Sequence, residues 1–152
     1  MNSNFFDKAR ANMVNNQLLP NGVKNLDLIE SFDNTKKELF VPDSEKEVVY
    51  SDSDILISPD RYLVRTFVLA KMFEHCSFSK DDSVLVIGCS TGYSVAIISN
   101  LVSYVFGVEN CKKLVERANS VLSHMGCLNT CLLYTSDAAD EGLGVDLGGR
   151  RI

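Results

Sequence analysis

Residues 83–93 read S-V-L-V-I-G-C-S-T-G-Y and carry the clearest structural signal in the chain. Ser83 to Ile87 is a continuous aliphatic run, which is typical of a strand buried on both faces of a parallel sheet. Glycines at 88 and 92 predict a tight turn, and apolar residues between Tyr93 and Val102 recur at helical spacing. The stretch therefore predicts a strand, a glycine turn and a helix in succession.

A second strand and a second helix follow. Tyr104 to Val108 is again aliphatic and aromatic, and ends at Glu109. The apolar residues from Leu114 to Met125 lie on one face of a helix, and Gly126 stands where a C-cap glycine is expected. A βαβα order requires a right-handed crossover and a parallel strand pair. We therefore expect an α/β, Rossmann-like fold.

The N-terminal part is expected to be mostly helical. Short helices are predicted before Pro42, and another from about Leu63 to His75. The acidic segment from Asp43 to Asp54 is interpreted as a solvated loop or arm. Residues 1–80 then form a helical part, and residues 81–130 form the βαβα half.

Composition narrows the function classes. The chain has 152 residues, is 45% hydrophobic and has a formal net charge of −5. It shows no basic patch, no apolar run of about 20 residues and no signal-like N-terminus, so we expect no nucleic acid, no membrane span and a cytoplasmic location. The five cysteines form no C-x-x-C pair, which argues against a metal site.

The glycine turn and the acid at the next strand end indicate a nucleoside-containing cofactor. A helix N-terminus attracts an anionic group, and Gly88 and Gly92 allow the backbone to approach a ligand closely. Glu109 is placed to accept hydrogen bonds from ribose hydroxyls. Two simpler interpretations stay open: the glycines form only a tight turn, and Glu109 is only a solvated strand-end acid.

Two cofactors compete for this turn. A dinucleotide favours G-x-G-x-x-G, but Ser90 and Tyr93 stand at the second and third glycine positions. Bulk at Tyr93 works against a nicotinamide-dependent oxidoreductase and favours S-adenosylmethionine. Core packing is an equally good interpretation of Tyr93.

Several motifs in the same order resemble the protein-L-isoaspartate O-methyltransferase family. They are Asn12–Leu18, Glu38–Pro42, Leu69–Met72, Val84–Tyr93 and Val105–Glu109. The resemblance implies a methyltransferase fold with S-adenosylmethionine bound by Gly88, Ser90, Gly92, Tyr93 and Glu109. It also implies methyl transfer to the carboxylate of a damaged, isoaspartyl residue in a protein, which is a repair reaction. It assigns no catalytic residue.

Three positions depart from the family pattern. The family usually has an acid at Val86, a glycine at Ser90 and a serine or threonine at Val64; Ser58 matches the hydroxyl only with a gap. Val64 and Val86 motivate an alternative function, a non-catalytic S-adenosylmethionine-binding or interaction module of the same fold.

Residues 131–152 are expected to be a non-native or disordered tail. Their first part, C-L-L-Y-T-S-D-A-A-D-E, resembles a translated sequencing-library adapter; the other interpretation is a natural acidic, glycine-rich tail. Residues 1–130 would then be a partial methyltransferase domain, the N-terminal helices plus the first βαβα unit only. With two strands and an open sheet edge, we expect marginal stability, aggregation, and weak or no cofactor binding.

Overall fold

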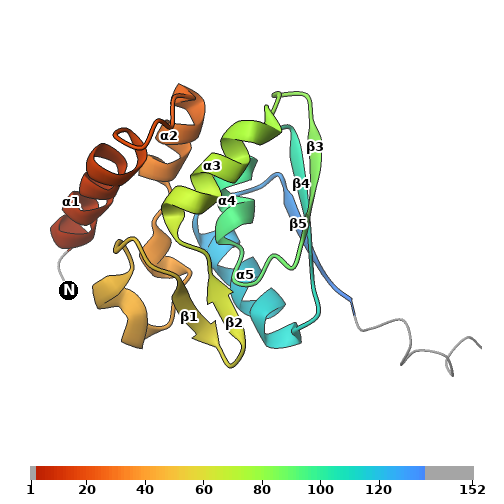
Figure 1. The fold of residues 1–152 in the computed structure, drawn as a ribbon. Coiled ribbons are helices and arrows are strands. Elements are labelled where there is room, and N and C mark those ends of the chain that lie inside the picture. The colour runs from red at the N-terminus through yellow and green to blue at the C-terminus, as the bar shows by residue number, and fades with distance from the viewer. Residues whose placement is uncertain (1–2, 136–152) are drawn as a thin grey trace, which may run out of the picture.

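The computed structural model describes residues 3–135 as helices packed against a parallel sheet, with a small hairpin beside them (Figure 1). The N-terminal elements are α1 (Ser3–Met13), a π-helical segment (Val14–Leu18), α2 (Leu26–Asn34) and two 3-10 segments (Lys37–Leu39 and Asp43–Val48). The hairpin strands are β1 (Ile55–Ser58) and β2 (Arg61–Leu63), followed by α3 (Thr66–Cys76). The sheet region contains β3 (Ser83–Ile87), α4 (Tyr93–Ser99), β4 (Tyr104–Glu109), α5 (Lys112–His124) and β5 (Thr130–Tyr134).

The main sheet is parallel, in the order β3-β4-β5. This confirms the βαβα unit, with α4 and α5 as its crossovers. The expected number of strands is wrong, because Thr130–Tyr134 pairs along β4 and adds a third strand. The expected tail therefore begins inside a strand, and residues 136–152 lie outside the described residues.

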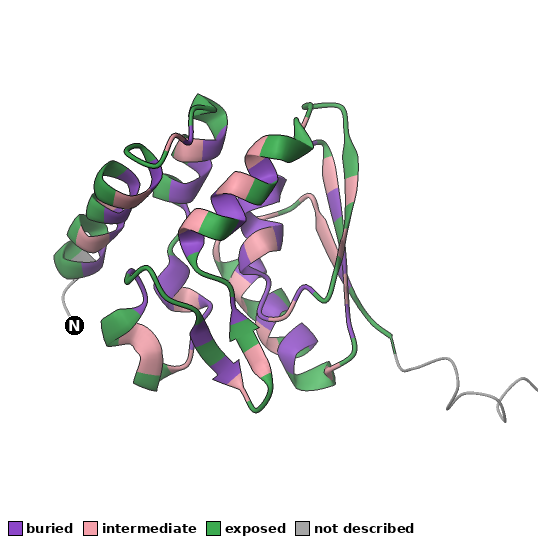
Figure 2. Ribbon diagram, viewed as in Figure 1, coloured by how far each residue is buried: buried purple, intermediate pink, exposed green. Residues whose placement is uncertain are grey.

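One face of the sheet is covered and the other is open. The helices lie on one side of β3–β5 (Figure 1), and exposed positions alternate along the strands (Figure 2). Val105 and Leu132 are buried on the covered face, whereas Leu85 and Ile87 are 58% and 80% exposed. The prediction that Ser83–Ile87 is buried on both faces is therefore wrong, because no element within residues 3–135 packs on the second face.

The N-terminal helices are tied together by a buried polar cluster. The Tyr50 hydroxyl donates to Glu38 Oε2 at 2.5 Å, and Arg10 lies 3.8 Å from the other carboxylate oxygen of Glu38. The expected solvated segment Asp43–Asp54 is a surface segment except at Val49 and Tyr50, which are buried. No helix in the described part of the chain is long and apolar enough to cross a bilayer.

The start of α3 also differs from the prediction. Leu63 was expected to begin the helix, but it is buried as the last residue of β2 and pairs with Ile55. Its apolar side chain fits a helical stripe and a hairpin equally well, so the pattern could not separate them. Gly126, which follows the C-cap residue Met125 of α5, has φ +75°, so the expected left-handed glycine at the end of this helix is confirmed.

Candidate cofactor site

The turn after β3 is built from left-handed residues. Gly88, Ser90 and Gly92 have φ values of +69°, +50° and +89°. A side chain at Gly92 would also meet Ala118 of α5 at 3.1 Å, so this glycine provides a close helix contact as well as a turn. At Gly88 an added Cβ would meet nothing within 4 Å, which leaves the turn open towards a ligand.

Glu109 closes the opposite side of this turn. Only 2% of the residue is exposed, and its carboxylate accepts three backbone N–H groups: Ser90 at 3.0 Å, Asn110 at 2.9 Å and Cys111 at 3.0 Å. The end of β4 is therefore joined to the glycine turn through one side chain. The solvated-acid interpretation is wrong, because the carboxylate is buried and hydrogen-bonded.

A third group comes from the hairpin. Arg61 Nη2 lies 3.5 Å from Glu109 Oε1 and donates to Asn110 Oδ1 at 2.5 Å. A cavity of about 190 Å³ lies between these groups and the strand ends. Its lining includes Arg61, Ile87, Gly88, Val108, Glu109 and Asn110.

Tyr93 lies in the core, outside this cavity. Its ring is 1% exposed and packs edge-on against Phe32 and Phe40, with centroid distances of 6.3 and 5.5 Å. Burial raises the pKa of the Tyr93 hydroxyl well above its usual value. Of the two interpretations of Tyr93, the structure supports core packing. Gly88, Ser90 and Glu109 are brought together, while Gly92 faces α5.

Comparison with known proteins identifies the family. The model of the protein-L-isoaspartate(D-aspartate) O-methyltransferase family matches residues 9–140. The chain belongs to this family. A protein-L-isoaspartate O-methyltransferase of Geobacter metallireducens is 33% identical over 124 residues, which cover 82% of this chain and 57% of that protein. The chain thus spans a little over half the length of that relative.

Solved structures show the same fold. A protein-L-isoaspartate O-methyltransferase superposes with a TM-score of 0.73 at 24% identity, covering 84% of this chain and 42% of the other. A Plasmodium falciparum protein assigned to the same enzyme class, in complex with S-adenosyl-L-homocysteine, superposes with a TM-score of 0.70 at 17% identity, covering 83% of this chain and 62% of the other. The chain therefore has the α/β fold of S-adenosylmethionine-dependent methyltransferases.

The three residues that depart from the family pattern differ in how far they are buried and in what they contact. Val64 is exposed between β2 and α3, whereas Val86 is half-buried and pairs with Gly107 on the covered face. Ser90 contributes its backbone N–H to Glu109, a contact that does not depend on its side chain. Two hydroxyls of the turn, Ser90 Oγ and Thr91 Oγ1, are buried and have no hydrogen-bond partner among the described residues. Such orphaned groups fit a turn that is completed by a polar ligand.

Sequence reasoning missed two charged residues, Arg61 at the site and Lys37 in the core. Arg61 contacts Glu109 across the hairpin, and Lys37 is fully buried with its ammonium donating to Thr66 Oγ1 at 2.9 Å. Burial lowers the pKa of Lys37 to about 8, with smaller opposing effects of Asp52 and Asp54. These contacts join segments far apart in sequence, so no local pattern could have indicated them.

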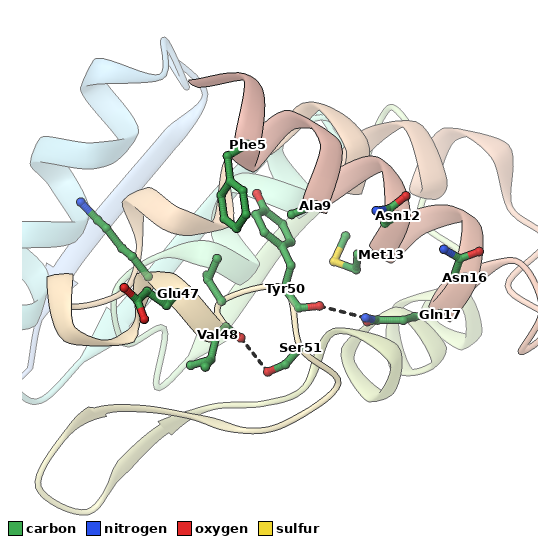
Figure 3. Close-up of a pocket in the computed structure, with 12 residues that line it drawn as sticks. Phe5, Ala9, Asn12, Met13, Asn16, Gln17, Glu47, Val48, Tyr50 and Ser51 are labelled. Atoms are coloured by element: carbon green, nitrogen blue, oxygen red, sulfur yellow. Dashed lines mark hydrogen bonds between the residues drawn. The ribbon is translucent and has the colours of Figure 1, made fainter. Parts of the chain in front are cut away.

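A larger cavity lies elsewhere in the described part of the chain. It has a volume of about 370 Å³ and lies between α1 and residues 46–51 (Figure 3). Its walls combine Phe5 and Met13 with the amides of Asn12 and Asn16, and Gln17 donates to the Tyr50 carbonyl at 2.8 Å. It includes no residue of the glycine turn and no residue predicted for the site. Within residues 3–135 no cluster of His, Cys, Asp and Glu is arranged to hold a metal ion.

Proposed function

We propose that this chain is the cofactor-binding part of a protein-L-isoaspartate O-methyltransferase that uses S-adenosylmethionine. One observation carries the proposal: Glu109, buried at the end of β4, accepts the Ser90 N–H of the glycine turn and lines a cavity beside Gly88. An acid there can accept both ribose hydroxyls, and the left-handed turn leaves room for a close ligand. Gly88, Ser90 and Glu109 are the proposed binding residues. Gly92 and Tyr93 support them by packing.

The reaction needs little acid–base help from the protein. An aspartyl or isoaspartyl carboxyl has a pKa of about 4, so the oxygen that attacks is already ionised at neutral pH. The cofactor supplies an activated methyl group: an O–C bond forms, the S–C bond breaks, and its electron pair stays on sulfur. The protein then has to align the reactants and exclude water. The absence of an assigned base does not weigh against an enzyme of this kind.

The substrate proposal is an isoaspartyl-containing protein or peptide, with no nucleic acid or membrane as partner. It rests on family membership and on the name of the relative from Geobacter metallireducens. Because the chain spans 57% of that relative, activity and substrate are proposals for the complete protein. The cytoplasmic location remains a prediction from the sequence.

A non-catalytic module is the second candidate function. It is favoured by Val64, which places an exposed apolar side chain where the family usually has a hydroxyl. It predicts cofactor binding without methyl transfer. The two candidates are therefore separated by measuring binding and transfer on the same protein.

The test uses S-adenosylhomocysteine binding and transfer of labelled methyl to an isoaspartyl peptide, with the same peptide carrying normal aspartate as the control. We expect weak binding that falls by about tenfold or more in Glu109→Gln, because a hydrogen bond to a charged group is lost. Glu116→Gln, an exposed acid on α5, is the matched variant and should bind normally. Binding by the complete protein without ester formation supports the non-catalytic candidate. Absence of any binding refutes the proposal.

A further inference from the structure

The nucleoside site is closed by a side chain that does not belong to the glycine turn. Arg61 lies at the start of β2 and reaches the carboxylate of Glu109 and the amide of Asn110. Its side chain is 42% exposed, whereas that of Glu109 is 1% exposed. Arg61 is thus the solvent-facing cover of a buried acid.

The hydrogen-bond partners of Glu109 show which of its contacts a ligand could replace. Oε2 accepts the Ser90 N–H, and Oε1 accepts the N–H groups of Asn110 and Cys111. These three donors are backbone groups fixed by the turn and by the end of β4. The remaining contact, Arg61 to Oε1, comes from a flexible side chain, which can leave without moving the backbone.

The small volume of the cavity also indicates that the contact between Arg61 and Glu109 has to open. Pockets for ligands of drug size are typically about 300–1,000 Å³, and the cavity beside Gly88 has about 190 Å³. A nucleoside cofactor therefore needs additional room. Among the lining residues, Arg61 combines a long side chain with anchorage outside the parallel sheet.

The hairpin backbone is held in place by buried side chains, so only the side chain of Arg61 has to move when its contact with Glu109 opens. Ile55, Ile57 and Leu63 are buried, and β1 and β2 are paired. We propose that Arg61 is a latch: it pairs with Glu109 in the ligand-free chain, competes with the ribose hydroxyls for Oε1, and swings away when a nucleoside binds. This rests on the proposed function, since the competing ligand is its cofactor. Arg61 is a positioning residue of the site, one that opposes binding.

The test compares nucleoside affinity in two arginine variants, with S-adenosylhomocysteine as the probe and ligand-observed NMR or equilibrium dialysis as the measurement. Arg61→Ala should bind about 2- to 5-fold more tightly, which is the range for a partly exposed ion pair. Arg65→Ala is the matched control, because its side chain is 44% exposed and pairs with Asp54 away from the cavity. Its affinity should be unchanged. Structural damage would weaken binding, so a gain in affinity separates the latch from a merely structural role.

A second probe pair tests the competition for the diol. The gain in Arg61→Ala should be larger for adenosine than for 2′-deoxyadenosine, because the latter has one hydroxyl fewer to compete for Glu109. If the original chain binds S-adenosylhomocysteine and Arg61→Ala binds it no more tightly, or if both probes gain equally, the latch is refuted and the proposed function stands. If neither chain binds any of these nucleosides, the proposed function fails and the latch fails with it.

Discussion

Two buried charged residues, Glu109 beside the glycine turn and Lys37 in the core, differ in how the fold accommodates their charges. Glu109 receives three backbone N–H groups, so the fold supplies its counter-charge as fixed dipoles. Lys37 has one hydrogen-bond acceptor, Thr66 Oγ1, and lies 5.8 Å from the centroid of the Tyr93 ring. A buried ammonium without a paired carboxylate is destabilising unless it loses its proton. Lys37 is therefore the residue whose protonation should couple most visibly to stability.

We expect Lys37 to make the protein more stable as the pH rises from 8 to 10. Its pKa is about 8 in the folded chain and about 10.5 when unfolded, so in this window the unfolded state binds the extra proton. The unfavourable contribution, on the order of 3 kcal/mol, is fully present below pH 8 and fades towards pH 10. Lys37→Met should therefore be more stable than the original chain at pH 7, and the difference should shrink with rising pH.

Urea unfolding of both chains at several pH values checks this. Lys36→Met is the control, since Lys36 is the exposed neighbour in sequence. A stability difference between Lys37→Met and the original chain that does not vary with pH would show that Lys37 is not buried as a charge.

At the scale of elements, the sequence predicted those helices, strands and turns that depend on the spacing of nearby residues. The strand, turn and helix of residues 83–99 follow from an aliphatic run, two glycines and helical spacing. Glu109 was placed at a strand end by the same reasoning. Arg61 against Glu109 and Lys37 against Thr66 were not predictable, because each contact depends on how the hairpin and the helices pack. The exposure of β3 depends likewise on which elements cover the sheet.

β5 is the element for which sequence and structure differ most. Its residue Leu132 is 8% exposed on the covered face, and its Cδ2 lies only 2.2 Å from where a Cβ on Gly107 would stand. The absence of a side chain at Gly107 is thus what lets Leu132 pack into the core.

We expect Leu132→Ala to lower the free energy of unfolding by about 2–4 kcal/mol, because a buried leucine leaves a cavity when truncated. Leu133→Ala is the control within the same strand, since Leu133 is 50% exposed, and should change it by about 0.5 kcal/mol or less. Chemical denaturation of the two variants measures both values. Equal, small effects would mean that β5 is not part of the folded domain and would support the adapter interpretation.

At the scale of the whole molecule, helices cover one face of the sheet, and no element within residues 3–135 covers the other. Leu85, Ile87, Phe106 and Leu133 are exposed, and they alternate along the strands with residues of the covered face, so they lie on the face that no described helix covers. Parallel sheets are normally covered on both faces, and a contiguous apolar patch favours association. Within residues 3–135 this face is open, which is a physical cause for association of the chain, and the chain spans little more than half the length of its Geobacter metallireducens relative.

This cause predicts self-association through the open face. The original chain should form larger species as its concentration rises in sedimentation velocity, and should bind a dye that reports exposed apolar surface. Leu85→Thr combined with Ile87→Thr should raise the concentration needed for association by about tenfold or more, because two apolar side chains leave the contact. Leu56→Thr is the matched control, since Leu56 is 44% exposed on β1, outside the parallel sheet. If the Leu56 variant suppresses association as strongly as the sheet variant, the contact lies on the hairpin side, and the open face is not what makes the chain associate.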